Sequence, residues 1–301
     1  MLFEKLSLLT RTINMNLILY YLLILPISYL PYSLLYKVSN FLSFIFKNLF
    51  KYRKEVIYKN LKNSFPEKNQ YEIQNLADKF YSHFSDLIVE SFKGFTISKK
   101  QITQRLQVEN QYVIDKFKNQ NIILIGGHYN NWEICGQGLP NYFNHDLLAI
   151  YKPLTNKYFD KKMKNSREKF GLKMIPMKYT KRYFETSDDK PKAILFGSDQ
   201  SPSNNKRAYW TEFLNQETAF LFGAEKYAME FNWPVIYGSI NKNKRGYYKV
   251  NYQIITEDPT NCNEGYIISK FAQLLENDIK YKPEYWLWSH NRWKRKKNLK
   301  D

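Results

Sequence analysis

The sequence predicts an α/β fold in which a mixed sheet is covered by helices and preceded by an N-terminal membrane-anchoring helix. From residue 106 onward, short apolar runs rich in β-forming residues alternate with longer amphipathic segments, the order expected of strands and helices layered around a sheet. Ahead of that region, no charged residue occurs between Thr12 and Tyr36. We therefore expect a membrane anchor or interfacial segment over residues 1–50 and one folded domain over residues 51–301.

The uncharged stretch is long enough to cross a bilayer. Residues Leu17 to Leu35 are rich in Leu, Ile and Tyr, and about 20 apolar residues span the hydrocarbon core. Pro26, Pro31 and the apolar run from Phe41 to Phe50 also fit a kinked or interfacial segment, so spanning and lying in the interface both stay open. A buried helix of a soluble protein is the alternative.

Basic residues crowd the far side of this stretch. They are Lys47, Lys51, Arg53 and Lys54, whereas only Lys5 and Arg11 precede it. The positive-inside bias then places the folded domain in the cytoplasm.

Two helices are predicted next, over Lys54 to Asn63 and Gln70 to Phe95, because apolar residues recur there at helical spacing and Pro66 separates them. The alternating region then supplies the sheet and its covering helices. Strands are expected over Asn121 to Gly126, Leu147 to Tyr151, Lys192 to Gly197, Pro234 to Ile240 and Tyr247 to Ile255. Helices are expected near Trp132 to Leu139, Lys157 to Phe170, Thr218 to Phe231 and Gly265 to Asp278.

Composition restricts the class of protein. With 44% hydrophobic residues the 301-residue chain can bury a core, so disorder as a whole is excluded. The formal charge of +18 favours an anionic partner, such as a membrane surface, nucleic acid or an acidic protein. Cys135 and Cys262 lie far apart and form no CxxC, which argues against a disulfide framework or a zinc site and fits a reducing compartment.

One motif carries chemistry. His128 follows Gly126-Gly127 at the end of a predicted strand, and Glu133 stands five positions later at the start of a predicted helix. Imidazole titrates near neutrality, and a nearby carboxylate can fix its tautomer and stabilise its protonated form. The pair is therefore predicted to activate a hydroxyl or an amine, at the strand end where α/β sheets build sites.

Other common site patterns are missing from the sequence. It contains no GxGxxG and no GxxxxGK[ST], so nucleotide chemistry is disfavoured. None of the four histidines pairs with another at the spacing of metal ligands.

Several segments around His128 resemble the lysophospholipid acyltransferase superfamily, and within it the late (lauroyl or myristoyl) acyltransferases of lipid A biosynthesis. The resemblance runs from the anchor to about Lys294. It rests on Tyr52-Arg53-Lys54 through Phe65-Pro66-Glu67, Tyr151-Lys152-Pro153 with Arg167, Gly197-Ser198-Asp199-Gln200, and the closing run Pro283 to Lys294. Many members have arginine at the position of Lys152 and aspartate at that of Glu133.

The resemblance implies a glycerolipid acyltransferase-like fold and acyl transfer without a cofactor or a metal. His128 would take the proton from an acceptor hydroxyl as it attacks a thioester carbonyl, and Glu133 would orient His128. The donor would be acyl carrier protein, an acidic partner, and the acceptor a hydroxyl of a lipid A precursor in the membrane. The implied location is the bacterial inner membrane, with the catalytic domain on the cytoplasmic side.

Four further residues are candidates for substrate binding. Lys152 and Arg167 would contact phosphate or an oxyanion, although Arg167 also fits a solvated helix face. Asp199 and Gln200 follow a buried strand and would either line the site or form a turn. His290 is interpreted as a packing residue, and the basic run from Lys294 to Lys297 as a membrane-surface or solvated segment.

Three alternatives stay open. The acceptor could be another lipid, such as an aminolipid or a glycolipid. The 25 tyrosines and the basic charge would also suit a nucleic-acid-binding protein, but the lysines are spread along the chain rather than clustered with aromatic residues, so nucleic acid is not expected as a partner. A metal-dependent hydrolase using His128 and Glu133 would need further ligands that the sequence does not offer.

Overall fold

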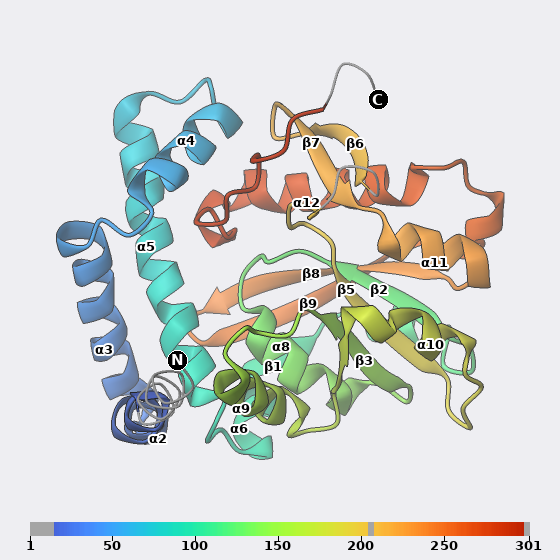
Figure 1. Ribbon diagram of the computed structural model, residues 1–301, viewed down its shortest axis with the longest axis horizontal. Coiled ribbons are helices and arrows are strands. Elements are labelled where there is room, and N and C mark those ends of the chain that lie inside the picture. The colour runs from blue at the N-terminus through green and yellow to red at the C-terminus, as the bar shows by residue number, and fades with distance from the viewer. Residues whose placement is uncertain (1–14, 204–207, 298–301) are drawn as a thin grey trace, which may run out of the picture.

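The computed structural model describes residues 15–203 and 208–297 and confirms the mixed sheet. Its seven strands run in the order β1-β9-β8-β2-β5-β3-β4 (Figure 1). Neighbouring strands are parallel throughout, except that β8 and β9 form an antiparallel hairpin. In sheet order the strands are β1 (Leu106–Val108), β9 (Tyr247–Thr256), β8 (Val235–Lys244), β2 (Ile122–Gly126), β5 (Lys192–Gly197), β3 (Asp146–Tyr151) and β4 (Lys173–Pro176).

All five predicted strands of this sheet are present. The strands β1 and β4, which are the two edge strands, are not predicted from the sequence. They have only three and four residues, too few to display a period of two clearly.

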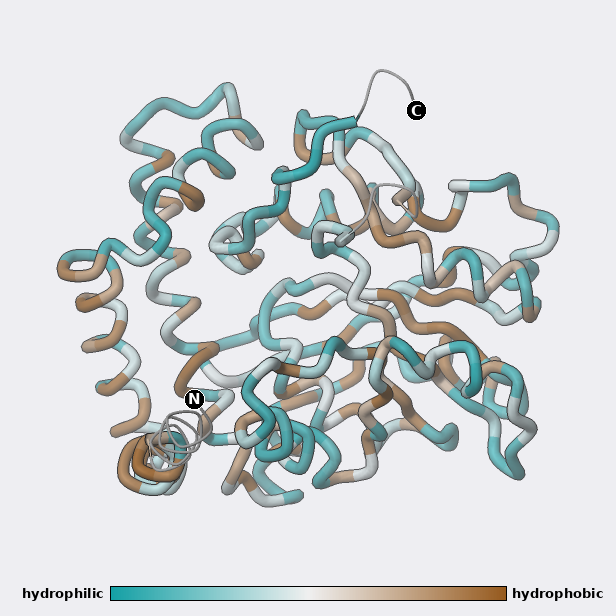
Figure 2. Tube along the Cα trace, in the orientation of Figure 1, coloured by the Kyte–Doolittle hydropathy of each residue, from teal (hydrophilic) through white to brown (hydrophobic). Residues whose placement is uncertain are grey.

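Helices cover both faces of the sheet. Along β2, Ile123 and Ile125 belong to one buried cluster, and Ile122 and Leu124 belong to the other, as the alternation of a strand requires. The first cluster lies under α11 (Gly223–Phe231) and α12 (Tyr266–Tyr281), the second under α6 (Lys99–Arg105), α7 (Tyr112–Asp115) and α8 (Trp132–Gly138). Figure 2 shows hydrophobic residues concentrated along the strands and the N-terminal helices.

The N-terminal segment forms two helical stretches, over residues 15–29 and 32–49, rather than one long helix, and the type of helix changes within each. It consists of η1 (Leu19–Ile24), which is π-helical, α2 (Leu25–Tyr29), α3 (Tyr32–Phe44) and the π-helical η2 (Ile45–Leu49). The continuous helix expected over Leu17 to Leu35 is interrupted because Leu30, which precedes Pro31, is extended with ψ of 142°. Of the helices in residues 15–203 and 208–297, none is long and apolar enough to cross a bilayer.

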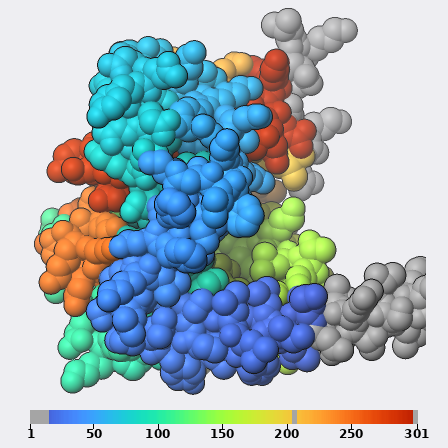
Figure 3. All heavy atoms as spheres, turned by 90° about the vertical axis from the view of Figure 1, so that its left-hand side faces the viewer, coloured from blue at the N-terminus to red at the C-terminus, as the bar shows by residue number. Residues whose placement is uncertain are grey.

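This N-terminal segment lies against the long helix α5 (Gln70–Lys93). Both α2 and α3 pack on α5, and Figure 3 shows residues of this range extending across that face of the molecule. Asn69 and Glu72 form a capping box at the start of α5, because each side chain accepts a hydrogen bond from the other residue's backbone N–H. The helix α4 (Lys54–Ser64) precedes α5, so both helices predicted in this region are confirmed.

The helix predicted over Thr218 to Phe231 is wrong in its first five residues. Residues Ala208–Phe213 (β6) and Gln216–Leu221 (β7) form a separate antiparallel hairpin, and the helix α11 begins only at Gly223. Leu214 and Asn215 make the two-residue turn with φ of 52° and 59°. Leucine rarely adopts positive φ, so this turn lacks the usual Asn-Gly signature of a hairpin.

The remaining elements lie between the strands or, for η6 and η7, on either side of α12 after the last strand. They are α9 (Lys157–Glu168) and α10 (Thr180–Glu185), with short 3₁₀ segments η3 (Leu139–Tyr142), η4 (Met177–Tyr179), η6 (Pro259–Asn261) and η7 (Pro283–Tyr285).

Candidate active site

The site forms where two neighbouring parallel strands end. Gly126 and Gly197 are the last residues of β2 and β5, and they stand opposite each other in the register of the sheet. His128 and Asp199 each follow two positions later. Parallel strands bring their carboxyl ends to one edge, so the register alone places these two residues side by side.

Asp199 holds His128 through two hydrogen bonds. Its Oδ1 lies 2.6 Å from Nδ1 of the imidazole, and its Oδ2 accepts from the backbone N–H of His128 at 2.8 Å. The indole N–H of Trp286 also donates to Oδ2 at 2.8 Å. The carboxylate is 2% exposed, so it is a rigid acceptor that fixes the imidazole in place.

Two glycines make room for this arrangement. A Cβ on Gly197 would lie 3.2 Å from Cε1 of His128, and a Cβ on Gly127 would lie 2.8 Å from both methyl carbons of Leu275. The imidazole itself packs edge-on against Trp132, with ring centroids 5.0 Å apart. A larger residue at Gly127 or Gly197 would block the close approach of Leu275 and His128 to the backbone.

The electrostatics of the pair favour a charged imidazole beside a carboxylate. Burial by itself would lower the pKa of His128, but Asp199 and, to a smaller extent, Glu133 raise it above its ordinary value. Burial would raise the pKa of Asp199, but the neighbouring imidazole and the hydrogen bonds lower it to about 2. Each partner thus stabilises the ionised form of the other.

The free nitrogen of the imidazole faces Gln200. When Nδ1 carries the proton donated to Asp199, Nε2 has an unshared pair, and the side-chain nitrogen of Gln200 lies 3.2 Å from it. The imidazole is 23% exposed, so a substrate can reach it.

Glu133 is bound by Arg167 rather than by His128. Nε of Arg167 donates to Oε2 of Glu133 at 2.8 Å, and Nη2 donates to Oε1 at 2.5 Å, which is the bidentate geometry of a strong ion pair. No hydrogen bond joins Glu133 to His128 in the described part of the chain. The carboxylate that contacts the imidazole is Asp199, for which the sequence predicts only substrate binding or a turn.

A largely apolar cavity of about 200 Å³ lies beside this cluster. His128, Glu133 and Arg167 are among its lining residues. Most of the rest are hydrophobic side chains from the strands of the large sheet, from the α8–η3 segment and from the residues just before β4, including Leu124, Leu139, Ala149, Leu172, Met174, Leu195, Ile240 and Val250. A cavity of this character suits an alkyl chain.

Comparison with known proteins identifies the family. The family model for bacterial lipid A biosynthesis acyltransferases matches residues 2–295.

The chain belongs to this family of acyltransferases.

The resemblance noted in the sequence is thereby confirmed, and with it the assignment as an acyltransferase of lipid A biosynthesis with a lipid acceptor. No curated protein matches the chain.

The four candidates for substrate binding are placed differently in the acyltransferase. Gln200 contacts His128, and Arg167 contacts Glu133. Asp199 is buried behind His128 and has its acceptor oxygens occupied. Lys152 is exposed just after β3 and is not among the residues that line the cavity, whereas its neighbour Tyr151 is.

The C-terminal segment packs against the residues that follow β2 and β5. Besides the indole bond to Asp199, Tyr129 and Trp286 form a backbone bridge, and the backbone of Asn130 donates to the carbonyl of Tyr285 at 2.9 Å. His290 accepts from the backbone N–H of Ser201 at 3.2 Å, and burial lowers its pKa to about 4, so it is a neutral packing residue as expected. The sequence does not predict this role of Trp286, because nothing in an aromatic run distinguishes the indole that meets a carboxylate.

In the described residues, no three His, Cys, Asp or Glu side chains are grouped so that they could hold a metal ion.

Proposed function

We propose that this acyltransferase moves a fatty acyl chain from a thioester of acyl carrier protein to a hydroxyl of a lipid A precursor, with His128 as the general base. The observation that carries the proposal is the buried bond between Asp199 and Nδ1 of His128. It leaves Nε2 free to accept a proton next to an apolar cavity, in a chain of the lipid A acyltransferase family.

The reaction needs one base and no covalent enzyme intermediate. The acceptor oxygen attacks the thioester carbonyl while its proton passes to Nε2, the carbon–sulfur bond breaks, and the protonated imidazole returns the proton to the departing thiolate. The products are an ester and the free thiol of the carrier. Asp199 stabilises the imidazolium formed on the way, as the third member of a triad does.

Gln200 and Arg167 supply donors near the reacting atoms. The amide of Gln200 lies beside Nε2, where it can donate to the acceptor oxygen or to the carbonyl oxygen as charge develops. Arg167 lines the cavity, and its positive charge there is paired with the carboxylate of Glu133. We therefore assign Glu133 an electrostatic effect on His128 that supplements the orienting effect of Asp199.

The acyl chain of the donor would occupy the apolar cavity. Its wall contains small residues, Ala149, Cys135 and Gly136, so that larger side chains there would shorten the space available. Chain length is the property that such a wall controls.

The acidic carrier would dock on a basic surface beside the cavity, which we define as Lys152, Lys157 and Lys161. All three are exposed, and Lys157 and Lys161 lie one turn apart on α9, the helix that also carries Arg167. Replacing all three by glutamate is expected to raise KM for the carrier-bound thioester through charge repulsion. KM for the same acyl thioester of free pantetheine is expected to stay unchanged; an equal rise for both donors would contradict this docking surface.

The membrane would be met by the apolar face of residues 15–50. Large hydrophobic side chains stand exposed there, among them Leu22 at 74%, Phe41 at 63% and Phe44 at 57%. Such a segment can lie in the interface with its apolar face in the acyl region and the nearby lysines among anionic headgroups. We propose that the enzyme works in this way at the cytoplasmic face of the bacterial inner membrane. Replacing the three residues by serine is expected to abolish cosedimentation with anionic vesicles.

The deciding experiment is an assay of purified enzyme with acyl carrier protein thioesters against a panel of acceptors. The panel contains a lipid A precursor, an aminolipid and a glycolipid. We expect ester formation on the lipid A precursor, and transfer only to another lipid would identify a different acceptor. His128→Ala is expected to abolish transfer while the protein stays folded, and retained activity would refute the base assignment.

A matched control is His145→Ala, because that imidazole is also buried but binds backbone carbonyls of Phe117 and Gln120. It is expected to keep its acyl transfer activity.

A further inference from the structure

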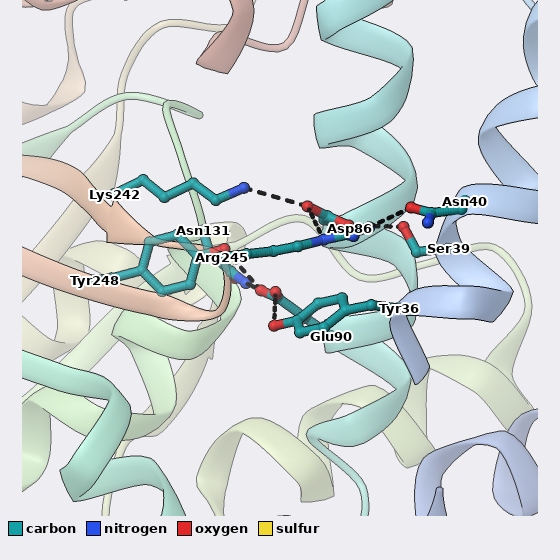
Figure 4. A network of polar contacts seen from close by, with 9 residues as sticks. All are labelled: Tyr36, Ser39, Asn40, Asp86, Glu90, Asn131, Lys242, Arg245 and Tyr248. Carbon is teal, nitrogen blue, oxygen red and sulfur yellow. Dashed lines mark hydrogen bonds and ion pairs between the residues drawn. The ribbon is translucent and has the colours of Figure 1, made fainter. Parts of the chain in front are cut away.

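Glu90, a buried carboxylate outside the catalytic cluster, joins three distant parts of the chain. It lies on α5 and is 1% exposed. Its Oε1 accepts from the hydroxyl of Tyr36 on α3 at 2.8 Å, and its Oε2 accepts from the hydroxyl of Tyr248 on β9 at 2.7 Å and from the side-chain amide of Asn131 (Figure 4). All three partners donate, so the carboxylate acts as the acceptor of the whole network.

Asn131 connects this network to the site. It is fully buried, stands between His128 and Glu133, and caps α8 because its Oδ1 accepts from the backbone N–H of Ile134 at 3.0 Å. Its other side-chain atom, the amide nitrogen, is the one that binds Glu90. Glu90 therefore fixes which way the Asn131 amide points, and with it the first turn of the helix that carries Glu133.

Tyr36 connects the network to the N-terminal segment. Its hydroxyl fits against the turn between β8 and β9, where a Cβ on Gly246 would overlap it at 1.9 Å and where φ is +75°. Further along α3, Phe41 and Phe44 are exposed. The segment with the apolar surface thus contributes a hydrogen-bond donor to the framework of the site.

A second polar link between α3 and α5 also reaches the turn between β8 and β9, but it does not reach Asn131. One helical turn before Glu90, Asp86 accepts from the hydroxyl of Ser39 at 2.7 Å and pairs with Arg245 at 2.6 Å (Figure 4). Arg245 in turn donates to Asn40 at 2.7 Å. This link holds α3 on the body but does not include Asn131, which makes it a natural control.

We propose that Glu90 is a positioning residue for acyl transfer. Through its hydrogen bonds to Tyr36 and Asn131, it makes the geometry of residues 128–133 depend on how α3 packs against α5. The inference rests on the proposed role of His128 as the base. In consequence, residues 15–50 do not serve only to bind a surface, because they also order the start of α8 from which Glu133 faces the cavity.

The test compares two single-group deletions on α3 in the full chain. Tyr36→Phe removes the hydroxyl that binds Glu90, and Ser39→Ala removes the hydroxyl that binds Asp86. Each variant is assayed with the carrier thioester in detergent micelles for kcat and KM, and its Tm is measured. Hydrogen exchange of the Ile134 amide reports directly on the Asn131 cap.

Tyr36→Phe is expected to lower kcat about tenfold with KM for the donor unchanged, since small displacements of catalytic groups cost rate rather than binding. The Ile134 amide should exchange faster in this variant. Ser39→Ala is expected to lower Tm comparably but to retain wild-type kcat and Ile134 exchange.

Two outcomes would overturn the proposal. The first is an equal loss of kcat in the two variants, which would reflect a general loosening of α3. The second is unchanged hydrogen exchange of the Ile134 amide in Tyr36→Phe. Failure of the proposed function is recognised separately, because His128→Ala would then keep its activity whatever the α3 variants do.

Discussion

The substitution Asp199→Asn tests the candidate site most sharply because it changes one atom in the structure. Two N–H groups, the backbone of His128 and the indole of Trp286, point at Oδ2. The asparagine must keep its oxygen there, since the opposite orientation would set its NH₂ group against both donors. Its NH₂ group then faces Nδ1 of His128.

The imidazole responds by changing its tautomer. Nδ1 must now accept a hydrogen bond, so the ring proton moves to Nε2, the atom that has to take the proton from the acceptor. The same change of tautomer in a catalytic triad lowers kcat by about 10⁴-fold, and we expect a loss of about 10³- to 10⁴-fold here. That loss corresponds to about 4–5 kcal/mol of transition-state stabilisation.

The assay is steady-state ester formation with saturating donor and acceptor, together with circular dichroism to verify folding. Asp278→Asn is a matched control, because Asp278 is also an aspartate that accepts from two groups, the hydroxyls of Tyr237 and Ser239, and hydroxyls can reorient around an amide. The control should keep its activity. If Asp199→Asn retained kcat within about tenfold of the wild type, Asp199 would not set the tautomer of His128 and the reasoning above would be refuted.

Three further predictions follow from the same geometry. Glu133→Gln keeps one hydrogen bond to Arg167 but removes a charge that raises the pKa of His128. The acid limb of the kcat/KM profile should therefore move to lower pH, and kcat should fall about 10- to 100-fold. A loss of kcat as large as that of Asp199→Asn would instead support Glu133 as the orienting carboxylate. Because the pKa of Asp199 is lowered from 3.8 to about 2, its ionised form stabilises the fold above pH 3.8 by about 2 kcal/mol, and this contribution is lost as the pH falls toward 2. Urea unfolding at several pH values should show that the free energies of unfolding of wild type and Asp199→Asn converge over that range. A constant difference between the two free energies would contradict this prediction. Ala149→Phe should fill part of the cavity and shift donor preference toward shorter acyl chains in competition assays, whereas an unchanged preference would place the chain elsewhere.

Much of the fold is legible in the sequence because its signals are local. Apolar runs bounded by turn residues locate β2, β3, β5, β8 and β9, and helical spacing locates α4 and α5. Errors occur where the signal is short or atypical. The edge strands β1 and β4 are too brief to show a period, and the turn at Leu214 and Asn215 uses a leucine at positive φ.

The site is only partly legible for a different reason. His128 is conspicuous because it follows two glycines at a strand end, and that setting is a property of neighbouring residues in the chain. Its partner was predicted to be Glu133, which is close in sequence, but Arg167 binds Glu133 on both oxygens. Asp199 is 71 residues away, and sequence spacing alone does not reveal such a partner.

The sequence by itself determined the five longer strands of the large sheet and most of the helices, the place of the histidine and the family to which the chain belongs. The tertiary structure decided which carboxylate meets the imidazole, because strand order in a parallel sheet depends on how the connecting helices pack and not on the order of strands along the chain. The pairing of β2 with β5 sets Gly126 opposite Gly197, and that register brings Asp199 to Nδ1 of His128. It likewise placed Tyr36 of the N-terminal segment on Glu90, since a hydroxyl and a carboxylate 54 residues apart become partners only when α3 lies against α5.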